Sequence, residues 1–298
     1  MRRLLLLAFI WGWSFLFIKV AVEGMTPTAV AAARIGLGAI ALHVILRVRH
    51  EVLPRTRTFW RHAAVSALFA NIIPFTLLAW GEQRITSALT AVLNASTPLF
   101  TALAGLLYLK TRVDRRGVVG LLVGIVGVAV AAGVGGADFA GSSVAGSLAA
   151  VGAAACYGFA FTYASRHQMG VSALVAATGQ LTAGVLLLAP VAVATSVGEG
   201  VDLQPHRVLA VALLGFVGTG AAYLIYYRSL ADLGPTTTSL VTYMVPVIAV
   251  AVGVAVLDES FHARVVLGGA MIVVGIALVQ QRIGLPRRRA VVSTSTGG

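Results

Sequence analysis

The segment 85–130, ITSALTAVLNASTPLFTALAGLLYLKTRVDRRGVVGLLVGIVGVAV, is repeated later in the chain. The second copy, residues 233–278, reads LGPTTTSLVTYMVPVIAVAVGVAVLDESFHARVVLGGAMIVVGIAL, at a constant offset of 148 positions and with no gap. The aligned pairs include Pro98 with Pro246, Gly120 with Gly268 and Gly127 with Gly275. Both copies are apolar enough to cross a bilayer, so the repeated unit is a bundle of membrane helices. An odd number of spans in each unit would insert the two units in opposite orientations, as inverted repeats.

The composition excludes a soluble globular protein. Hydrophobic residues make up 58% of the chain, charged residues 11%, and the mean hydropathy is +0.93. Each transmembrane helix needs about 20 mostly apolar residues, and the apolar runs lack the alternation of a membrane barrel. The chain has ten such runs, at about 3–22, 28–47, 62–81, 88–108, 117–133, 143–163, 171–195, 207–227, 236–257 and 265–281. We therefore expect an all-α polytopic membrane protein with ten transmembrane helices in two inverted five-helix repeats.

The basic residues indicate how the helices are oriented. With ten alternating spans and a cytoplasmic N-terminus, the arginine-rich segments 47–61 and 110–116 both face the cytoplasm. The other side collects most of the acidic residues, namely Glu23, Glu82, Asp138, Glu199, Asp202, Asp258 and Glu259. This is the positive-inside pattern. We expect a multi-pass protein of the cytoplasmic membrane with both termini in the cytoplasm.

The repeat also includes the first helices, at an offset of 146. There Trp11 aligns with Tyr157, Gly12 with Gly158, and Arg34 with Gln180. The predicted division is a first five-helix repeat at 1–133, a linker loop at 134–145, a second repeat at 146–282 and a disordered basic cytoplasmic tail at 283–298.

The order and spacing of these features resemble the EamA-type transporters of the drug/metabolite transporter superfamily. The shared features are Trp11-Gly12 in the first helix, Arg34 in the second, Pro98 and Pro246 in the fourth and ninth, and the acidic turn Asp258-Glu259. The resemblance covers about residues 5–282 and implies export of amino acids, their analogues or other small metabolites through a central cavity. The chain departs from the family pattern at Lys110-Thr111, where a Gly-Glu pair is usual.

Polar and aromatic side chains inside the spans are the candidates for contact with a substrate, because they are costly in lipid unless they face a cavity or a partner. The predicted substrate-binding residues are Trp11, Arg34, Asn71, Asn94, Tyr157, Gln180, Tyr223 and Tyr243. Pro98 and Pro246 are predicted to kink their helices, either for packing or to line a path. Tyr226 and Tyr227 lie near a predicted helix end, where an interfacial aromatic belt is the simpler interpretation.

Two cations lie within the first two spans. Lys19 is close enough to a helix end for its ammonium group to reach the interface. Arg34 is deeper, and two roles remain open: it binds a substrate carboxylate, or it forms a structural ion pair with Glu23 or Glu82.

The sequence as a whole predicts a secondary transporter that moves a small metabolite, an amino acid or amphipathic analogue, outward by alternating access. A flippase for a lipid-linked carrier and a non-transporting receptor or scaffold are the alternatives. No nucleotide-binding loop, hydrolase motif or metal-ligand motif is present, so no enzyme activity, catalytic residue, metal or cofactor is predicted. The predicted partners are the small-molecule substrate and membrane lipids, with a coupling proton or counter-substrate, and no nucleic acid. No acidic residue is predicted in mid-membrane, so no carboxylate proton relay is evident.

Overall fold

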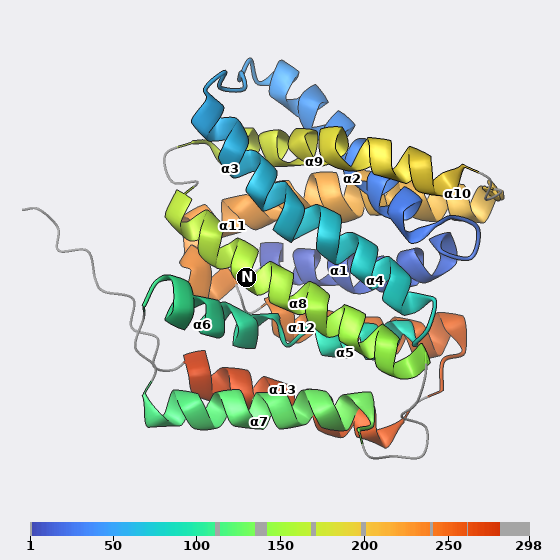
Figure 1. Ribbon diagram of the computed structural model, residues 1–298, viewed down its shortest axis with the longest axis vertical. Helices are drawn as coiled ribbons and strands as arrows, with labels where there is room; N and C mark the ends of the chain where they lie inside the picture. The colour runs from blue at the N-terminus through green and yellow to red at the C-terminus, as the bar shows by residue number, and fades with distance from the viewer. Residues whose placement is uncertain are drawn as a thin grey trace, which may run out of the picture.

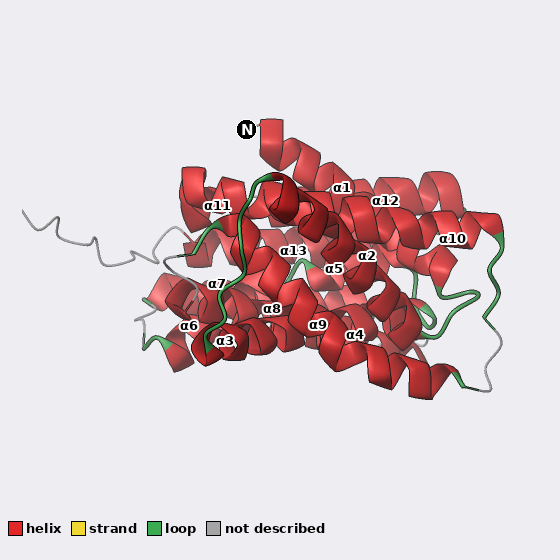
Figure 2. Cartoon of the chain, turned by 90° about the horizontal axis from the view of Figure 1, so that it is seen from above, coloured by secondary structure: helices red, strands yellow, loops and turns green. Residues whose placement is uncertain are grey.

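The computed structural model describes residues 2–110, 114–134, 142–167, 171–197, 201–238, 241–260 and 262–280. Figure 2 shows helices joined by loops, with no strand in this described part of the chain. The helices are α1 (Arg2–Ala21), α2 (Pro27–Val48), α3 (Arg57–Ala67), the π-helical segment η1 (Leu68–Ile72), α4 (Ile73–Glu82), α5 (Ser87–Asn94), α6 (Thr97–Tyr108), α7 (Arg115–Ala132), α8 (Ser142–His167), α9 (Ala173–Ser196), α10 (Pro205–Ala212), the π-helical segment η2 (Leu213–Ala221), α11 (Ala222–Thr238), α12 (Val241–Leu257) and α13 (Ala263–Gln280).

These described helices group into ten successive apolar segments. The third runs through α3, η1 and α4, the fourth through α5 and α6, and the eighth through α10, η2 and α11. Eight segments are long and apolar enough to cross a membrane, and α12 and α13 are shorter apolar helices. The predicted polytopic all-α fold with ten spans is confirmed.

Equivalent positions of the two repeats start and stop helices in the same way. Thr26 caps α2 by accepting a hydrogen bond from the Ala29 amide, and Ser172, at offset 146, caps α9 by accepting one from the Val175 amide. Lys110 and Asp258, at offset 148, follow the ends of α6 and α12 with φ of 54° and 51°. A residue in this left-handed region ends a helix, because the α-helical turn cannot continue through it.

The glycines of the repeated segment meet across α7 and α13, which lie side by side at the bottom of Figure 1. A Cβ built on Gly120 would lie 2.6 Å from the Gly275 carbonyl oxygen, and one on Gly127 would lie 2.8 Å from the Gly268 carbonyl oxygen. Gly120 and Gly268 are equivalent residues, as are Gly127 and Gly275, so the repeat operation exchanges the two contacts. A pseudo-two-fold axis between the repeats produces this exchange.

A second pair of contacts follows the same rule. Gly12 of α1 lies against Ile248 of α12, where a Cβ would approach the Ile248 Cγ2 to 2.5 Å. Its equivalent, Gly158 of α8, lies against Phe100 of α6, where a Cβ would lie 2.6 Å from the Phe100 carbonyl carbon. Ile248 is itself the equivalent of Phe100. Close backbone approach at small residues is how membrane helices gain packing energy without a hydrophobic driving force.

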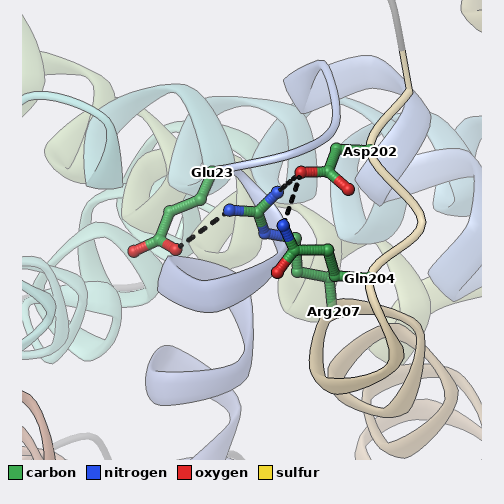
Figure 3. A network of polar contacts seen from close by, with 4 residues as sticks. All are labelled: Glu23, Asp202, Gln204 and Arg207. Atoms are coloured by element: carbon green, nitrogen blue, oxygen red, sulfur yellow. Dashed lines mark hydrogen bonds and ion pairs between the residues drawn. The ribbon is translucent and has the colours of Figure 1, made fainter.

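The end of the bundle that the charge pattern predicts to lie outside the cell is called the outer end here. Two of its loops are joined through Arg207, as Figure 3 shows. Arg207 forms ion pairs with Asp202 and with Glu23, the latter at 3.7 Å, and the Asp202 amide donates to the Gly24 carbonyl oxygen at 2.9 Å. The loop after α1 is therefore tied to the loop before α10.

The division into repeats, linker and tail stays a prediction. Most of the predicted linker and the whole predicted tail lie outside the described residues.

Candidate functional site

Arg34 is buried where α2 packs against η2 and α4. Its side chain retains 5% exposure, Nε donates to Thr219 Oγ1 at 2.9 Å, and the guanidinium carbon lies 3.9 Å from the centre of the Phe75 ring. Thr219 Oγ1 donates in turn to the Leu214 carbonyl oxygen at 3.0 Å. The face of an aromatic ring attracts a cation, but it does not neutralise the charge as a carboxylate does.

The hypothesis of a structural ion pair at Arg34 is wrong for this structure. Glu23 pairs with Arg207 at the outer end, and neither carboxylate oxygen of Glu82 has a hydrogen-bond partner among the described residues. No carboxylate of the described chain lies within ion-pair distance of Arg34. Arg34 is buried in the bundle, and its partners are a hydroxyl group and an aromatic ring.

Gln180, the equivalent of Arg34 in the second repeat, lies at the centre of a buried network of neutral polar groups. Its Nε2 donates to Asn71 Oδ1 at 2.6 Å, and its Oε1 accepts from the Tyr227 hydroxyl at 3.1 Å. Asn71 Nδ2 donates to the Tyr223 hydroxyl oxygen at 2.7 Å. Because these groups satisfy one another, the network can remain in an apolar interior at little cost.

The two polar centres are related by the repeat. Asn71 in η1 and Thr219 in η2 are equivalent at offset 148, so the Arg34–Thr219 bond corresponds to the Gln180–Asn71 bond. Both acceptors lie in π-helical segments. Such segments widen the helical turn and are frequent at functional sites. The same position of the fold therefore holds a charged donor in one repeat and a neutral donor in the other.

Aromatic side chains connect the two repeats beside these polar groups. Trp11 of α1 packs against Tyr226 with ring centres 5.8 Å apart, Tyr226 lies 5.9 Å from Phe161, and Phe161 stacks with Tyr157 at 6.2 Å. Tyr157 is also close enough to Arg34 for an electrostatic interaction. This aromatic row follows α1, α8 and α11 and suits an amphipathic solute better than a multiply charged one.

The structure brings six of the eight predicted site residues to this region: Trp11, Arg34, Asn71, Tyr157, Gln180 and Tyr223. The other two lie elsewhere. Asn94 is the last residue of α5, and Tyr243 of α12 packs beside the apolar cluster of α5, α6 and α13. Pro98 is in the first turn of α6, after the interruption at Ala95-Ser96, and Pro246 lies inside α12. The roles of all these residues stay predictions.

Five residues of the region are not among the predicted site residues: Phe75, Phe161, Thr219, Tyr226 and Tyr227. The interpretation of the two tyrosines as an interfacial belt is wrong, because one binds Gln180 and the other packs on Trp11. Thr219 had a signal in the sequence, since it aligns with Asn71 at offset 148. No group of three or more metal-ligating side chains occurs among the residues that the structure describes.

Comparison with known proteins identifies the family. The family model described as "EamA-like transporter family" matches residues 3–133 and 144–280. The "Uncharacterized inner membrane transporter YedA" of Escherichia coli K12 is 27% identical over 273 residues, 91% of this chain and 87% of that protein. The "Probable terminal-alkyne amino-acid exporter" of Streptantibioticus cattleyicolor is 26% identical over 280 residues, 94% of this chain and 92% of that protein. A solved crystal structure shares the fold with a TM-score of 0.63 and 20% identity, covering 94% of this chain and 96% of the other. The chain is thus a polytopic membrane transporter and belongs to the EamA-like transporter family.

Proposed function

We propose that the protein exports a small amino acid or amphipathic analogue across the cytoplasmic membrane by alternating access, with Arg34 binding the carboxylate of the substrate. The observation that carries this proposal is the buried guanidinium, which has no carboxylate within ion-pair distance in the described chain. A lone charge in the membrane interior is costly, so such a residue is retained where a ligand supplies the opposite charge.

The rest of the region fits the same substrate. Asn71, Gln180 and Tyr223 offer neutral hydrogen-bonding groups for a second polar group, and the row from Trp11 to Tyr157 offers an apolar wall. One relative carries the name of an amino-acid exporter, and an amino acid has the carboxylate that Arg34 requires.

The repeat supports alternating access as the mechanism. The α1–α12 and α6–α8 contacts are equivalent, so rocking one repeat against the other can exchange their geometries and open the site to either side. We propose the orientation with both termini in the cytoplasm, because it places the arginine-rich segments inside.

Metabolite profiling of the growth medium tests this function. Cells that overexpress the wild-type protein should release more of a carboxylate-bearing metabolite than cells that express Arg34→Gln. Glutamine fits the equivalent position in the second repeat, so the variant should reach the membrane at normal levels. Arg61→Gln, which removes an exposed arginine of α3, is the matched control and should behave as wild type.

Three outcomes would contradict the proposal. Equal medium profiles under several nutrient loads would refute export. Accumulation of a lipid-linked product on the opposite leaflet would favour a flippase. Ligand binding without flux in proteoliposomes would favour a receptor.

A further inference from the structure

A fully buried carboxylate lies at the outer end, apart from the candidate substrate site. Glu82 is the last residue of α4 and has 0% exposure. Neither of its carboxylate oxygens has a hydrogen-bond partner among the described residues. The sequence places Glu82 among the acidic residues of the outer loops, whereas the structure encloses it between helices.

The turn that follows Glu82 is held from two sides. Lys19 of α1 donates from Nζ to the carbonyl oxygens of Glu82 and Ile85, at 2.5 and 3.2 Å. The Glu259 carboxylate, after α12, accepts from the amides of Ser87 and Ala88 at 2.6 and 3.0 Å. The outer ends of α1, α4, α5 and α12 therefore meet at one turn. Lys19 reaches toward the helix end as predicted, and its ammonium group binds this turn there.

The charges around Glu82 do not pair with its carboxylate. Three charged groups lie close enough to interact with it electrostatically: Lys19 from α1, Arg34 from α2 and Glu259 from the turn after α12. On its own segment, Arg84 turns back onto the Trp80 carbonyl oxygen and ring. The residues of α8 that pack against Gly81 are Gly146, Ala149 and Ala150, none of which ionises.

Burial without hydrogen-bond donors favours the protonated form of Glu82 in this conformation. A buried carboxylate anion without hydrogen-bond donors loses its hydration, and Lys19 and Arg34 offset that loss only through space. The negative charge of Glu259, engaged with two amides, adds repulsion against a second anion in the same turn. A bound proton removes both penalties.

We propose that Glu82 is the proton-binding site that couples substrate export to proton movement, an inference that rests on the proposed transport function. When the outer ends separate, water reaches the carboxyl group, which exchanges its proton with the outer solution. Lys19, already at the Glu82 carbonyl oxygen, can then swing to pair with the ionised carboxylate. When the outer ends close, the site retains the proton that it carries.

The acidic pair Glu82 and Glu259 has no counterpart at the equivalent positions of the repeat. The equivalents of Glu82 and Glu259 at offset 148 are Leu230 and Thr111, so the opposite end has no corresponding acidic pair. When the inner ends open instead, water that reaches Arg34, which interacts electrostatically with Glu82, gives the retained proton a route to the cytoplasm. One site at one end can then bind a proton from one side and release it to the other.

Infrared spectroscopy tests the proton site without any substrate. At neutral pH, purified protein in lipid should show the carbonyl band of a protonated carboxylic acid, shifted in deuterium oxide. Glu82→Gln should abolish the band, and the matched control Glu23→Gln should retain it, because Glu23 is half-exposed and pairs with Arg207 at the same end. A wild-type spectrum without the band would overturn the proposal, even if the Glu82→Gln protein failed to fold. A band retained in folded Glu82→Gln would do so as well.

Flux in proteoliposomes tests the coupling. The probe is a terminal-alkyne amino acid, which can be quantified by azide coupling. An imposed gradient of one pH unit should drive about tenfold accumulation for one exchanged proton, the factor that corresponds to about 1.4 kcal/mol. Glu82→Gln should carry downhill flux and show no accumulation. Wild-type flux that does not depend on the pH gradient would refute the coupling. If the wild-type protein transports no probe, the proposed function is contradicted, and the infrared spectrum alone then tests the proton site.

Discussion

Replacing Gly268 by alanine should destabilise the fold by forcing α7 and α13 apart. The new Cβ would lie 2.4 Å from the Ala131 amide nitrogen and 2.5 Å from the Gly127 carbonyl oxygen. Both neighbours are backbone atoms, so no change of rotamer can relieve the contact. Ordinary contact begins at 3.4 Å, so the two helices must separate by about 1 Å along the whole glycine seam.

Overpacking of this kind costs about 1–3 kcal/mol, and the seam is sensitive because membrane helices associate mainly through close packing. The free energy of unfolding can be measured by titrating lipid–detergent micelles with sodium dodecyl sulfate. Gly36→Ala is the matched control, since a Cβ on Gly36 of α2 meets no atom within 4 Å. That control should be neutral or stabilising by up to about 1 kcal/mol, the difference in helix propensity. If Gly268→Ala were as stable as Gly36→Ala, the close approach at this seam would be refuted.

Three further predictions concern the polar network, the outer turn and the topology. Asn71→Leu should lower the free energy of unfolding by about 1–3 kcal/mol, because Gln180 and Tyr223 lose a buried partner. Adding Gln180→Leu should recover part of that loss. Strictly additive effects of the two substitutions on the free energy of unfolding would argue against the network. Glu259→Gln should lower the free energy of unfolding by about 0.5–2 kcal/mol, the range for a lost helix cap, and should speed hydrogen exchange at the Ser87 and Ala88 amides. Unchanged exchange at these amides would show that the cap is unimportant. Epitope tags at the two termini should be accessible only after the membrane is made permeable, and labelling of either tag in intact cells would contradict the proposed orientation.

The sequence predicted the helices and their equivalences but not their contacts. The offset of 148 aligned Gly120 with Gly268 and Gly127 with Gly275, and these four residues do form one interface. The alignment alone could not show that Gly120 meets Gly275 instead of its own equivalent. The direction of that pairing depends on the axis between the repeats, which is a property of the assembled bundle.

The candidate site shows a similar limit. Arg34, Asn71 and Gln180 were predicted as separate polar residues, because hydropathy marks each as unusual in a span. Their partners depend on packing between segments about 110 to 185 positions apart, which no local pattern encodes. The π-helical segments that hold Asn71 and Thr219 also have no marker in the sequence.

The burial of Glu82 is not predicted by the sequence, for a physical reason. Hydropathy predicts that a charged residue at the end of an apolar run is exposed, but its burial depends on the helices packed around it. Here Lys19 binds the turn that follows α4, and α8 packs against Gly81. The search for a mid-membrane carboxylate therefore missed a buried one at a helix end.

The most direct test of the central claim, that Arg34 binds the carboxylate of the substrate, compares the flux of an amino acid with that of its amide in proteoliposomes. A charge-assisted hydrogen bond contributes about 1.5–3 kcal/mol, which corresponds to a preference of about 10- to 100-fold for the carboxylate. The wild-type protein should show this preference, and Arg34→Gln, present at equal levels in the membrane, should transport the two compounds at similar rates. An unchanged preference in Arg34→Gln would contradict the account.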